Sequence, residues 1–540
     1  MSTYRVMISP RRSWARHLTL LGGLTAAAWA QPVTGSYRDR VLAIQEEIQA
    51  NHLEDARALL SAAFRQYPGD GGLDNLLGIV EIQEGHVARA KQAFAQAIAH
   101  SPKLTGAYLN LARIDMESAE TNAADQDEAA RLYDKVLLME PGNAEANFND
   151  ALLLNWSHRY AASLERLAKL DSEGRHGTRA EVLVCTDETA LGHEEAADRA
   201  AAELAANPAL TEQDAMSVLP ALRTAHRADL IDKIFTAANA RQPLSAGGLR
   251  ILGLAEEAEG KPQAARATLE RVFAMNPANA TPLIDLTRIA VDEKDYQGAL
   301  GYLAHARTLR PNDASLPYEF GVICLKMNLL GEAARAMGEA VKLAPENADY
   351  NFAMGKVEPL AEDPAKALPY LQKYIALRPD DPQGTLALGA AYFRNKDYDN
   401  AMVWLKRAEK VRSTEAEAKY YLGRILREQD KLEESLADLS AADQLHPDQP
   451  EVLAELGQVY LQMRNYPAAE KALDRSLQLD PDGYTANFAL LQLYAFNHDT
   501  RRAEQAKKFN AIKSKNDEEY RETMRVIEVR PDAVTNPQSR

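Results

Sequence analysis

Cysteine is almost absent from this sequence, which has only Cys185 and Cys324 among its 540 residues. Two thiols exclude a disulfide framework, and they also exclude zinc sites built from clustered cysteines. Because the two cysteines lie far apart along the chain, we expect each to be a small buried apolar residue rather than half of a bridge. The chain must then be stabilised by packing alone.

Positive charge is also scarce. Lys and Arg number 62 against 78 Asp and Glu, which gives a formal net charge of −16 at pH 7. Nucleic-acid binding needs a basic face that releases counterions, and electrostatic docking on anionic lipid also needs basic residues. The charge balance therefore predicts no nucleic acid among the partners and favours a soluble acidic protein.

The motifs of common enzymes are missing. The sequence has no H-E-x-x-H, no G-x-S-x-G, no C-x-x-C and no glycine-rich phosphate loop. None of the eleven histidines has another four residues later, the spacing that lets two rings share a metal on one helix face. We therefore predict that the chain is not an enzyme and has no cofactor or metal site.

Long apolar runs are missing except near the N-terminus. Residues 18–27 form an apolar segment too short to span a membrane, and Ala28-Trp29-Ala30 offers a cleavage site after it. The basic residues before this segment are Arg5, Arg11, Arg12 and Arg16. We predict that residues 1–30 are a secretory signal peptide cleaved before Gln31, so the mature chain is exported to the periplasm or beyond, without stable membrane insertion. The general secretory and twin-arginine routes both stay open.

What the second half of the sequence does have is a period of 34 residues. The seven equivalent positions are Pro277, Pro311, Pro345, Pro379, Ser413, Pro447 and Pro481. A fixed period of this length is typical of helix-turn-helix units, which stack because one unit alone cannot bury its apolar face. The proline fits just past the second helix, where it cannot continue that helix.

Small residues keep the same phase. With the proline numbered thirty-two in each unit, position eight is Gly253, Gly321, Gly355, Gly389, Gly423 and Gly457. Position twenty is alanine in six of the seven C-terminal units, the exception being Ser435. Small residues at fixed places on two helices let their backbones approach closely.

These positions together resemble the tetratricopeptide repeat family. The resemblance implies an all-α fold, a right-handed superhelical solenoid of helix-turn-helix repeats that binds partners on its surface. Following the phase back to Tyr37 predicts fourteen units over residues 37–513. A surplus of five residues before Pro141 is assigned to the inter-helix turn at 121–125.

The same phase predicts the domain organisation. Motif residues are well preserved at both ends of the array and worn in the middle. The predicted segments are the signal peptide 1–30, N-terminal repeats 31–143, degenerate repeats 144–245, a C-terminal array 246–513, and a charged C-terminal cap and tail 514–540. Because each repeat contacts only its neighbours, the degenerate segment should be the weakest part.

The resemblance also points to candidate binding residues. In similar proteins, positions two, five, nine, twelve and thirteen of the first helix line the concave face. Here position five is mostly apolar or aromatic, and position nine is basic in alternate units. The candidate partner-binding residues are Arg288, Tyr318, Phe352, Lys356, Leu386, Tyr420, Arg424 and Phe488. The alternative is that position five packs on the neighbouring unit and position nine carries ordinary solvated charge.

We therefore predict an exported, non-enzymatic scaffold that binds a protein or peptide segment in the concave groove. The alternative is an accessory subunit of an envelope polysaccharide or secretion assembly, contacting glycan or outer-membrane components. No unit combines a lysine at position five with an asparagine at position nine, so a receptor for the tails of chaperones is not expected. The partner, the pathway and the oligomeric state stay open.

Overall fold

The computed structural model describes residues 36–119, 122–361 and 364–523, and every regular element in these ranges is a helix. The predicted signal peptide and residues 524–540 lie outside them. The chain divides into two compact units, residues 1–272 and 273–540. None of the described helices is both long and apolar enough to cross a bilayer.

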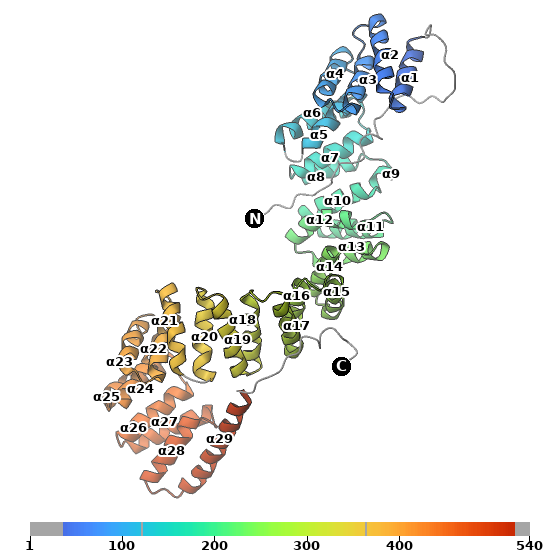
Figure 1. Ribbon diagram of the computed structural model, residues 1–540. Helices are drawn as coiled ribbons and strands as arrows, with labels where there is room; N and C mark the ends of the chain where they lie inside the picture. The colour runs from blue at the N-terminus through green and yellow to red at the C-terminus, as the bar shows by residue number, and fades with distance from the viewer. Residues whose placement is uncertain (1–35, 120–121, 362–363, 524–540) are drawn as a thin grey trace. The chain divides into compact units, whose positions relative to one another are not determined.

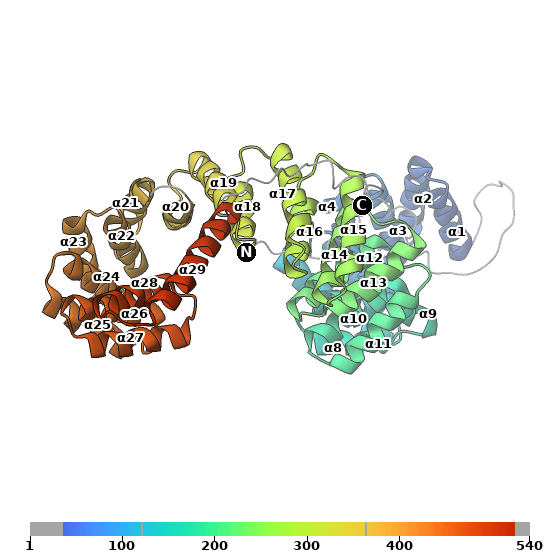
Figure 2. The same cartoon turned by 90° about the horizontal axis from the view of Figure 1, so that it is seen from below.

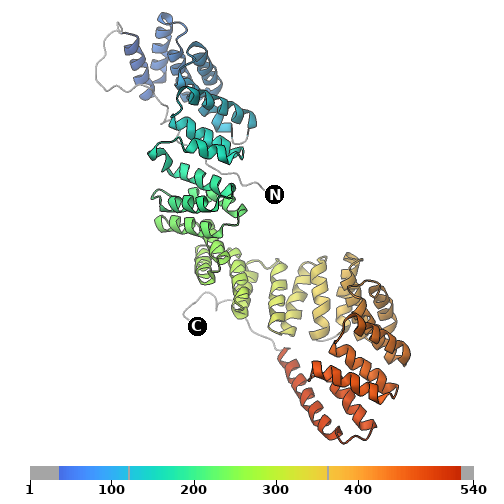
Figure 3. The same cartoon turned by 180° about the vertical axis from the view of Figure 1, so that it is seen from behind.

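Unit 1 is built from consecutive pairs of helices (Figures 1 and 3). Its helices are α1 (Tyr37–Gln49), α2 (Leu53–Gln66), α3 (Gly71–Gln83), α4 (Val87–His100), α5 (Thr105–Ala119), α6 (Ala123–Met139), α7 (Ala144–Trp156), α8 (Tyr160–Leu167), α9 (Ser172–Arg175), α10 (Thr178–Ala190), α11 (Glu194–Ala206), α12 (Glu212–Thr224), α13 (Ala228–Arg241), α14 (Ala246–Ala258) and α15 (Pro262–Met275), whose last residues cross the boundary of the unit.

Unit 2 continues the same alternation of first and second helices. Its helices are α16 (Thr281–Asp292), α17 (Tyr296–Leu309), α18 (Ser315–Lys326), α19 (Leu330–Leu343), α20 (Ala348–Ala361), α21 (Ala367–Leu377), α22 (Pro382–Arg394), α23 (Tyr398–Ala408), α24 (Glu415–Glu428), α25 (Leu432–Leu445), α26 (Pro450–Gln462), α27 (Tyr466–Leu479), α28 (Tyr484–Phe496) and α29 (Arg502–Thr523). Within the described residues, 29 α-helices form fourteen pairs plus the short α9, which confirms the predicted all-α repeat fold.

Glycine at position eight is required by the close approach of paired helices. A Cβ at Gly423 would lie 2.6 Å from Cγ of Leu439 on the partner helix, and one at Gly253 would lie 2.9 Å from Cγ of Leu269. Such distances are too short for real carbon atoms, so the sequence keeps glycine opposite a large residue.

The degenerate repeat of α10 and α11 solves the same packing problem in the opposite way. Position eight is Cys185 here, and the residue that faces it sixteen places later is Ala201 instead of a leucine. Both side chains are fully buried in one core cluster. Here the first helix carries the larger side chain, Cys185, and the second helix carries the smaller one, Ala201. A repeat that has lost the glycine motif can therefore still have a filled core. Both cysteines are free and buried, as expected.

The turns are closed by local hydrogen bonds. The second residue after most first helices adopts the left-handed conformation, as in Gly192 with φ 72° and Lys396 with φ 60°. At position four, the buried Asn351 side chain donates to the carbonyl oxygen of Pro345 at 2.9 Å. Pro345 lies in the turn between α19 and α20, so this bond ties the turn to the start of α20.

Some boundaries differ from the sequence-based prediction. The five surplus residues before Pro141 lengthen α5 to 15 and α6 to 17 residues rather than forming a long turn. The worn fourth unit has a second helix of only 8 residues, and the short α9 follows it. The predicted start of the cap at residue 514 falls inside α29, which continues to Thr523.

Helix α29 covers α28, the first helix of the final repeat in unit 2. Phe509 and Ile512 are buried, and the Phe509 ring lies 5.0 Å from Tyr484 and 5.3 Å from Phe488. The rest of α29 is polar and mostly exposed. This agrees with the need of a repeat array for a terminal element that hides one apolar face without presenting another.

Candidate functional site

Three successive first helices of unit 2, namely α20, α22 and α24, line one hollow of about 140 Å³. The helix pairs of unit 2 follow an arc in Figure 2. The first helices α22, α24 and α26 lie on the inner side of this arc, and the second helices α23, α25 and α27 lie on its outer side. The lining residues are Phe352, Gly355, Lys356, Gln383, Leu386, Ala387, Ala390, Ala391, Arg394, Glu417 and Tyr421. The hollow is large enough for one side chain of leucine or phenylalanine size, since apolar cavities of about 150 Å³ bind benzene.

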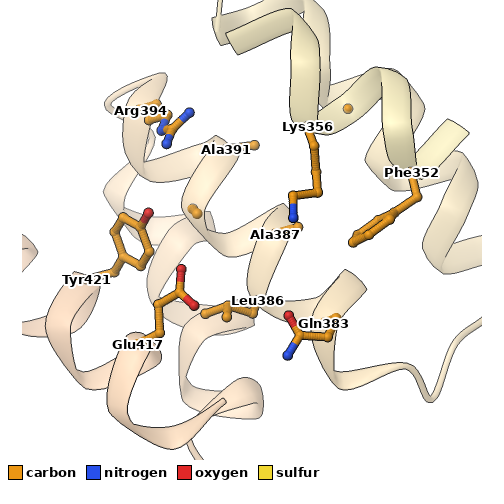
Figure 4. Close-up of a pocket in the computed structure, with 11 residues that line it drawn as sticks. Phe352, Lys356, Gln383, Leu386, Ala387, Ala391, Arg394, Glu417 and Tyr421 are labelled. Carbon is orange, nitrogen blue, oxygen red and sulfur yellow. The ribbon is translucent and has the colours of Figure 1, made fainter. Parts of the chain in front are cut away.

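One wall of the hollow is aromatic and basic. Phe352 is half-buried, and its ring lies 4.6 Å from that of Tyr374, which fixes its position. The Lys356 ammonium lies 5.5 Å from the centroid of the Phe352 ring, within the range of a cation–π contact. Figure 4 shows both side chains descending from α20 beside Ala387.

The opposite wall comes from α24 and the end of α22. Tyr421 is buried against Phe393, with the ring centroids 5.5 Å apart. Arg394 and Glu417 are exposed on either side of Tyr421 (Figure 4). Among the described residues, neither they nor Lys356 have an ion-pair partner within 4.0 Å. The rim therefore offers two basic groups and one acidic group to a ligand, around an apolar floor at Leu386 and Ala387.

The sequence-based candidates do not all belong to this hollow. Phe352, Lys356 and Leu386 line it, although Leu386 is only 3% exposed and serves as floor. Tyr318 is half-buried and packs on Tyr350 at 4.7 Å. The structure does not bring the remaining candidates into this hollow.

Arg424 and Tyr420 are used inside the array. Arg424 Nε lies 3.0 Å from Oε1 of the buried Glu455, and the guanidinium lies over the rings of Phe393 and Tyr420. Burial raises the pKa of Tyr420 to about 12. In this unit position five packs inside the array, as the alternative interpretation expects, whereas position nine forms an internal ion pair instead of carrying solvated charge.

The last two candidates lie at the ends of unit 2. Phe488 is 38% exposed, but its ring packs against Phe509 of α29. Arg288 is exposed on α16. Of the eight candidates, three therefore line the hollow, and Tyr318, Tyr420, Arg424 and Phe488 make contacts within the array.

The residues that sequence reasoning missed follow a simple rule. Gln383 and Glu417 hold position two of their units and Arg394 holds position thirteen, both of which are expected concave positions. Only positions five and nine entered the candidate set, so reading all five positions would have found these three. Tyr421 at position six had no signal in the pattern.

Two clusters of possible metal ligands lie in unit 1. They are Glu47 with His52 and Asp55, and Glu81 with Glu84 and His86. In each, a histidine at the start of the second helix bonds a glutamate five residues earlier, a spacing that a search along one helix face overlooks. Arg57 already pairs with both glutamates of the second cluster, at 2.8 and 2.5 Å.

Comparison with protein families gives matches along much of the chain. Two models described as "Tetratricopeptide repeat" match, one at residues 41–105, 235–314, 319–382 and 361–414, and the other at 426–494. No enzyme family matches. No curated protein matches the sequence.

Several solved structures are similar in fold. One is the Cut9–Hcn1 hetero-tetramer of the APC/C, with 15% identity, a TM-score of 0.34 and coverage of 85% of this chain and 96% of that one. A second is YrrB, described as having an unusual peptide-binding site, with 21% identity, a TM-score of 0.26 and coverage of 41% and 96%. A third is a repeat protein from Parabacteroides merdae, with 16% identity, a TM-score of 0.33 and coverage of 44% and 93%. These likenesses concern the fold alone.

Proposed function

Because the chain belongs to the tetratricopeptide repeat family, whose members typically mediate protein–protein interactions, we propose that it is an exported, non-enzymatic scaffold that binds a segment of another protein. The binding site is the hollow formed by α20, α22 and α24. The observation that carries this proposal is a hollow of one-side-chain size with an apolar floor, rimmed by Lys356 and Arg394, two basic groups without acidic partners among the described residues.

The rim chemistry defines the partner segment. An apolar side chain of the segment enters between Phe352 and Tyr421, and an acidic residue beside it pairs with Lys356 or Arg394. Such contacts with charged groups contribute about 1.5–3 kcal/mol when the partners are held in place. On a chain with a net charge of −16, most of the surface repels an acidic segment, so the two cations at the hollow confine its binding to this place.

Export is the second part of the proposal. It is supported by the basic N-terminal region, the short apolar segment and the cleavage site at Ala28-Trp29-Ala30. An exported scaffold would meet its partner in the cell envelope or outside the cell. The envelope is therefore the source in which to search for the partner.

The test uses the chain from Gln31 onward as bait in an envelope extract of the native host. The charge-reversal pair Lys356→Glu and Arg394→Glu should reduce capture of the specific partner at least tenfold, because each loses a charge-assisted contact. Phe352→Ala should reduce affinity by about 30-fold, the effect of removing an anchor worth about 2 kcal/mol.

A matched control is available at the C-terminal end of α23 and in the turn after it. Lys406→Glu with Lys410→Glu makes the same charge change at exposed residues outside the hollow and should leave capture unchanged. Circular-dichroism melts must be similar for all variants. Equal loss in both charge-reversal pairs would show a non-specific charge effect, and no loss in either would place the partner elsewhere. Retention of polysaccharide instead of protein would favour the alternative role in an envelope assembly.

A further inference from the structure

The turn between α1 and α2 brings three metal-ligand side chains together. Asn51 adopts the left-handed conformation, with φ 59°, and the backbone amide of His52 donates to the carbonyl oxygen of Glu47 at 2.9 Å. This tight turn places the last part of α1 beside the residues that begin α2. One ligand atom from each of Glu47, His52 and Asp55 therefore lies within 4.8 Å of the other two.

The spacing of these atoms suits a single small cation. Oxygen and nitrogen ligands lie about 2.0–2.2 Å from zinc, so two ligands of one ion can be up to about 4.4 Å apart. The imidazole Nδ1 of His52 already lies 2.9 Å from Oε2 of Glu47. The Asp55 side chain is exposed and has no hydrogen-bond or ion-pair partner among the described residues, so it is free to rotate inward and complete the set.

No lysine or arginine neutralises this cluster. Among the described residues, neither Glu47 nor Asp55 has a Lys or Arg nitrogen within 4.0 Å, and the one ion-pair contact of Glu47 is with His52. Two carboxylates that the fold holds close together repel each other unless a cation lies between them. A bound divalent ion would supply that charge and would be the largest charge at this turn.

The next repeat shows that a cluster of this kind attracts a cation. Glu81, Glu84 and His86 occupy the corresponding turn between α3 and α4, and His86 Nδ1 lies 3.0 Å from Glu81 Oε2. The guanidinium of Arg57 bonds both glutamates there, at 2.8 and 2.5 Å. The residue three places after the histidine is Arg89 rather than an acid. The protein itself therefore supplies the positive charge in the second repeat but not in the first.

A third turn contains the same pair without a third ligand. Between α10 and α11, His193 Nδ1 lies 2.7 Å from Glu188 Oε2, across the same spacing of five residues. The residue three places after this histidine is Ala196, so no carboxylate takes the position of Asp55. In the part of the chain that the structure describes, this turn holds no group of three ligands. It therefore serves as a natural comparison for the turn between α1 and α2.

We infer that Glu47, His52 and Asp55 form a site for one divalent transition-metal ion, best matched by zinc, in the first repeat of unit 1. The ion binds the unprotonated Nδ1 of the imidazole and one oxygen of each carboxylate, with water in the remaining position. A nitrogen ligand favours zinc over Ca²⁺ and Mg²⁺, which prefer oxygen ligands alone. The ion ties the end of α1 to the start of α2, independently of the hollow in unit 2.

Isothermal titration calorimetry with ZnCl₂ tests this site in the full chain, produced without a histidine tag and freed of metal with a chelator. We expect one zinc ion to bind more tightly than any others. His52→Ala and Asp55→Asn should each weaken this binding at least about tenfold, because each removes a ligand. Ca²⁺ at the same concentrations should not compete with zinc.

His193→Ala is the matched control, since His193 makes the same contact with a glutamate but has no third ligand beside it. This variant should keep the tightest zinc site unchanged. Hydrogen exchange locates the ion: zinc should slow the exchange of amides in residues 50–56 but not of those in residues 191–197. Circular-dichroism melts of the zinc-free variants check that each one folds.

Three results would each overturn the inference. They are the absence of a tight zinc site in the unmodified chain, equal zinc affinity in His52→Ala or Asp55→Asn, and equal binding of Ca²⁺, which would show a general attraction of the acidic chain for cations. None of them bears on the proposed function of the unit 2 hollow, because that function is tested by partner capture.

Discussion

Asp187 of α10 is a buried acid whose ionisation should weaken unit 1. It is fully buried, and Asn155 donates to its Oδ1 at 2.6 Å, whereas Oδ2 has no hydrogen-bond partner among the described residues. Burial raises the pKa of Asp187 from 3.8 to about 6, and the nearby polar side chains of Ser163 and Asn155 oppose this shift only in part. The folded state therefore binds its proton more tightly than the unfolded state does.

The direction and size of the pH effect follow from this shift. Between the unfolded pKa of about 4 and the folded value of about 6, the folded chain carries more protons, so the free energy of unfolding falls as the pH rises. A shift of roughly two units costs about 3 kcal/mol at about 1.4 kcal/mol per unit, and the cost is fully present above pH ~7. Asp187→Asn should remove most of it while keeping the bond from Asn155.

Urea unfolding followed by tryptophan fluorescence measures this effect. After removal of the predicted signal peptide, the tryptophans are Trp156, which packs in the core cluster next to α10, and Trp404 in unit 2. In a Trp404→Phe background the signal reports unit 1. Asp187→Asn should stabilise unit 1 by about 2–3 kcal/mol at pH 8 and much less at pH 4. The exposed Asp127→Asn serves as control.

Equal stability of Asp187→Asn and the unmodified chain at pH 8 would refute this reasoning. An unchanged slope of stability against pH between 4 and 7 would refute it as well, since the slope depends on the difference in bound protons and not on packing.

Three further outcomes are expected. Gly423→Ala should destabilise unit 2 by about 1–3 kcal/mol in urea unfolding because the new methyl group has no space, whereas Gly142→Ala, with no atom within 4 Å of the new Cβ, should be nearly neutral. Hydrogen exchange should be faster in residues 144–245 than in 280–481, and equal protection would show that volume exchange between paired helices fully compensates the worn motif. Mass spectrometry of the protein from its native host should find an N-terminus at Gln31, and intact Met1 would refute cleavage.

The repeat architecture was predictable from the sequence because its determinants are local and periodic. Gly423 and its equivalents at position eight, together with the prolines, report a packing constraint that recurs in every 34 residues. The phase alone was sufficient to count fourteen pairs through a region where Cys185 replaces the glycine. The lengthening of α5 and α6 was missed because a surplus of residues does not reveal which element takes it up.

The candidate site was predicted only in part, since it depends on contacts between repeats. Phe352 and Lys356 follow from their positions on α20, and both line the hollow. Arg424 has the same position as Lys356 two repeats later, yet the buried Glu455 neutralises it from the next repeat. A one-dimensional pattern assigns both residues the same role, and only the neighbouring helix decides which charge is available to a ligand.

The packing of Phe509 on Tyr484 and Phe488 also determines how this molecule can be extended. Stacking of similar repeats does not by itself limit their number. Helix α29 caps the array because its outward surface offers no apolar face on which another helix pair could pack. Extra repeats would therefore be accepted between existing pairs, whereas a repeat fused after Thr523 would find no surface to pack against. Removing α29 would expose the apolar face of α28, and we expect copies of the chain to associate through that face.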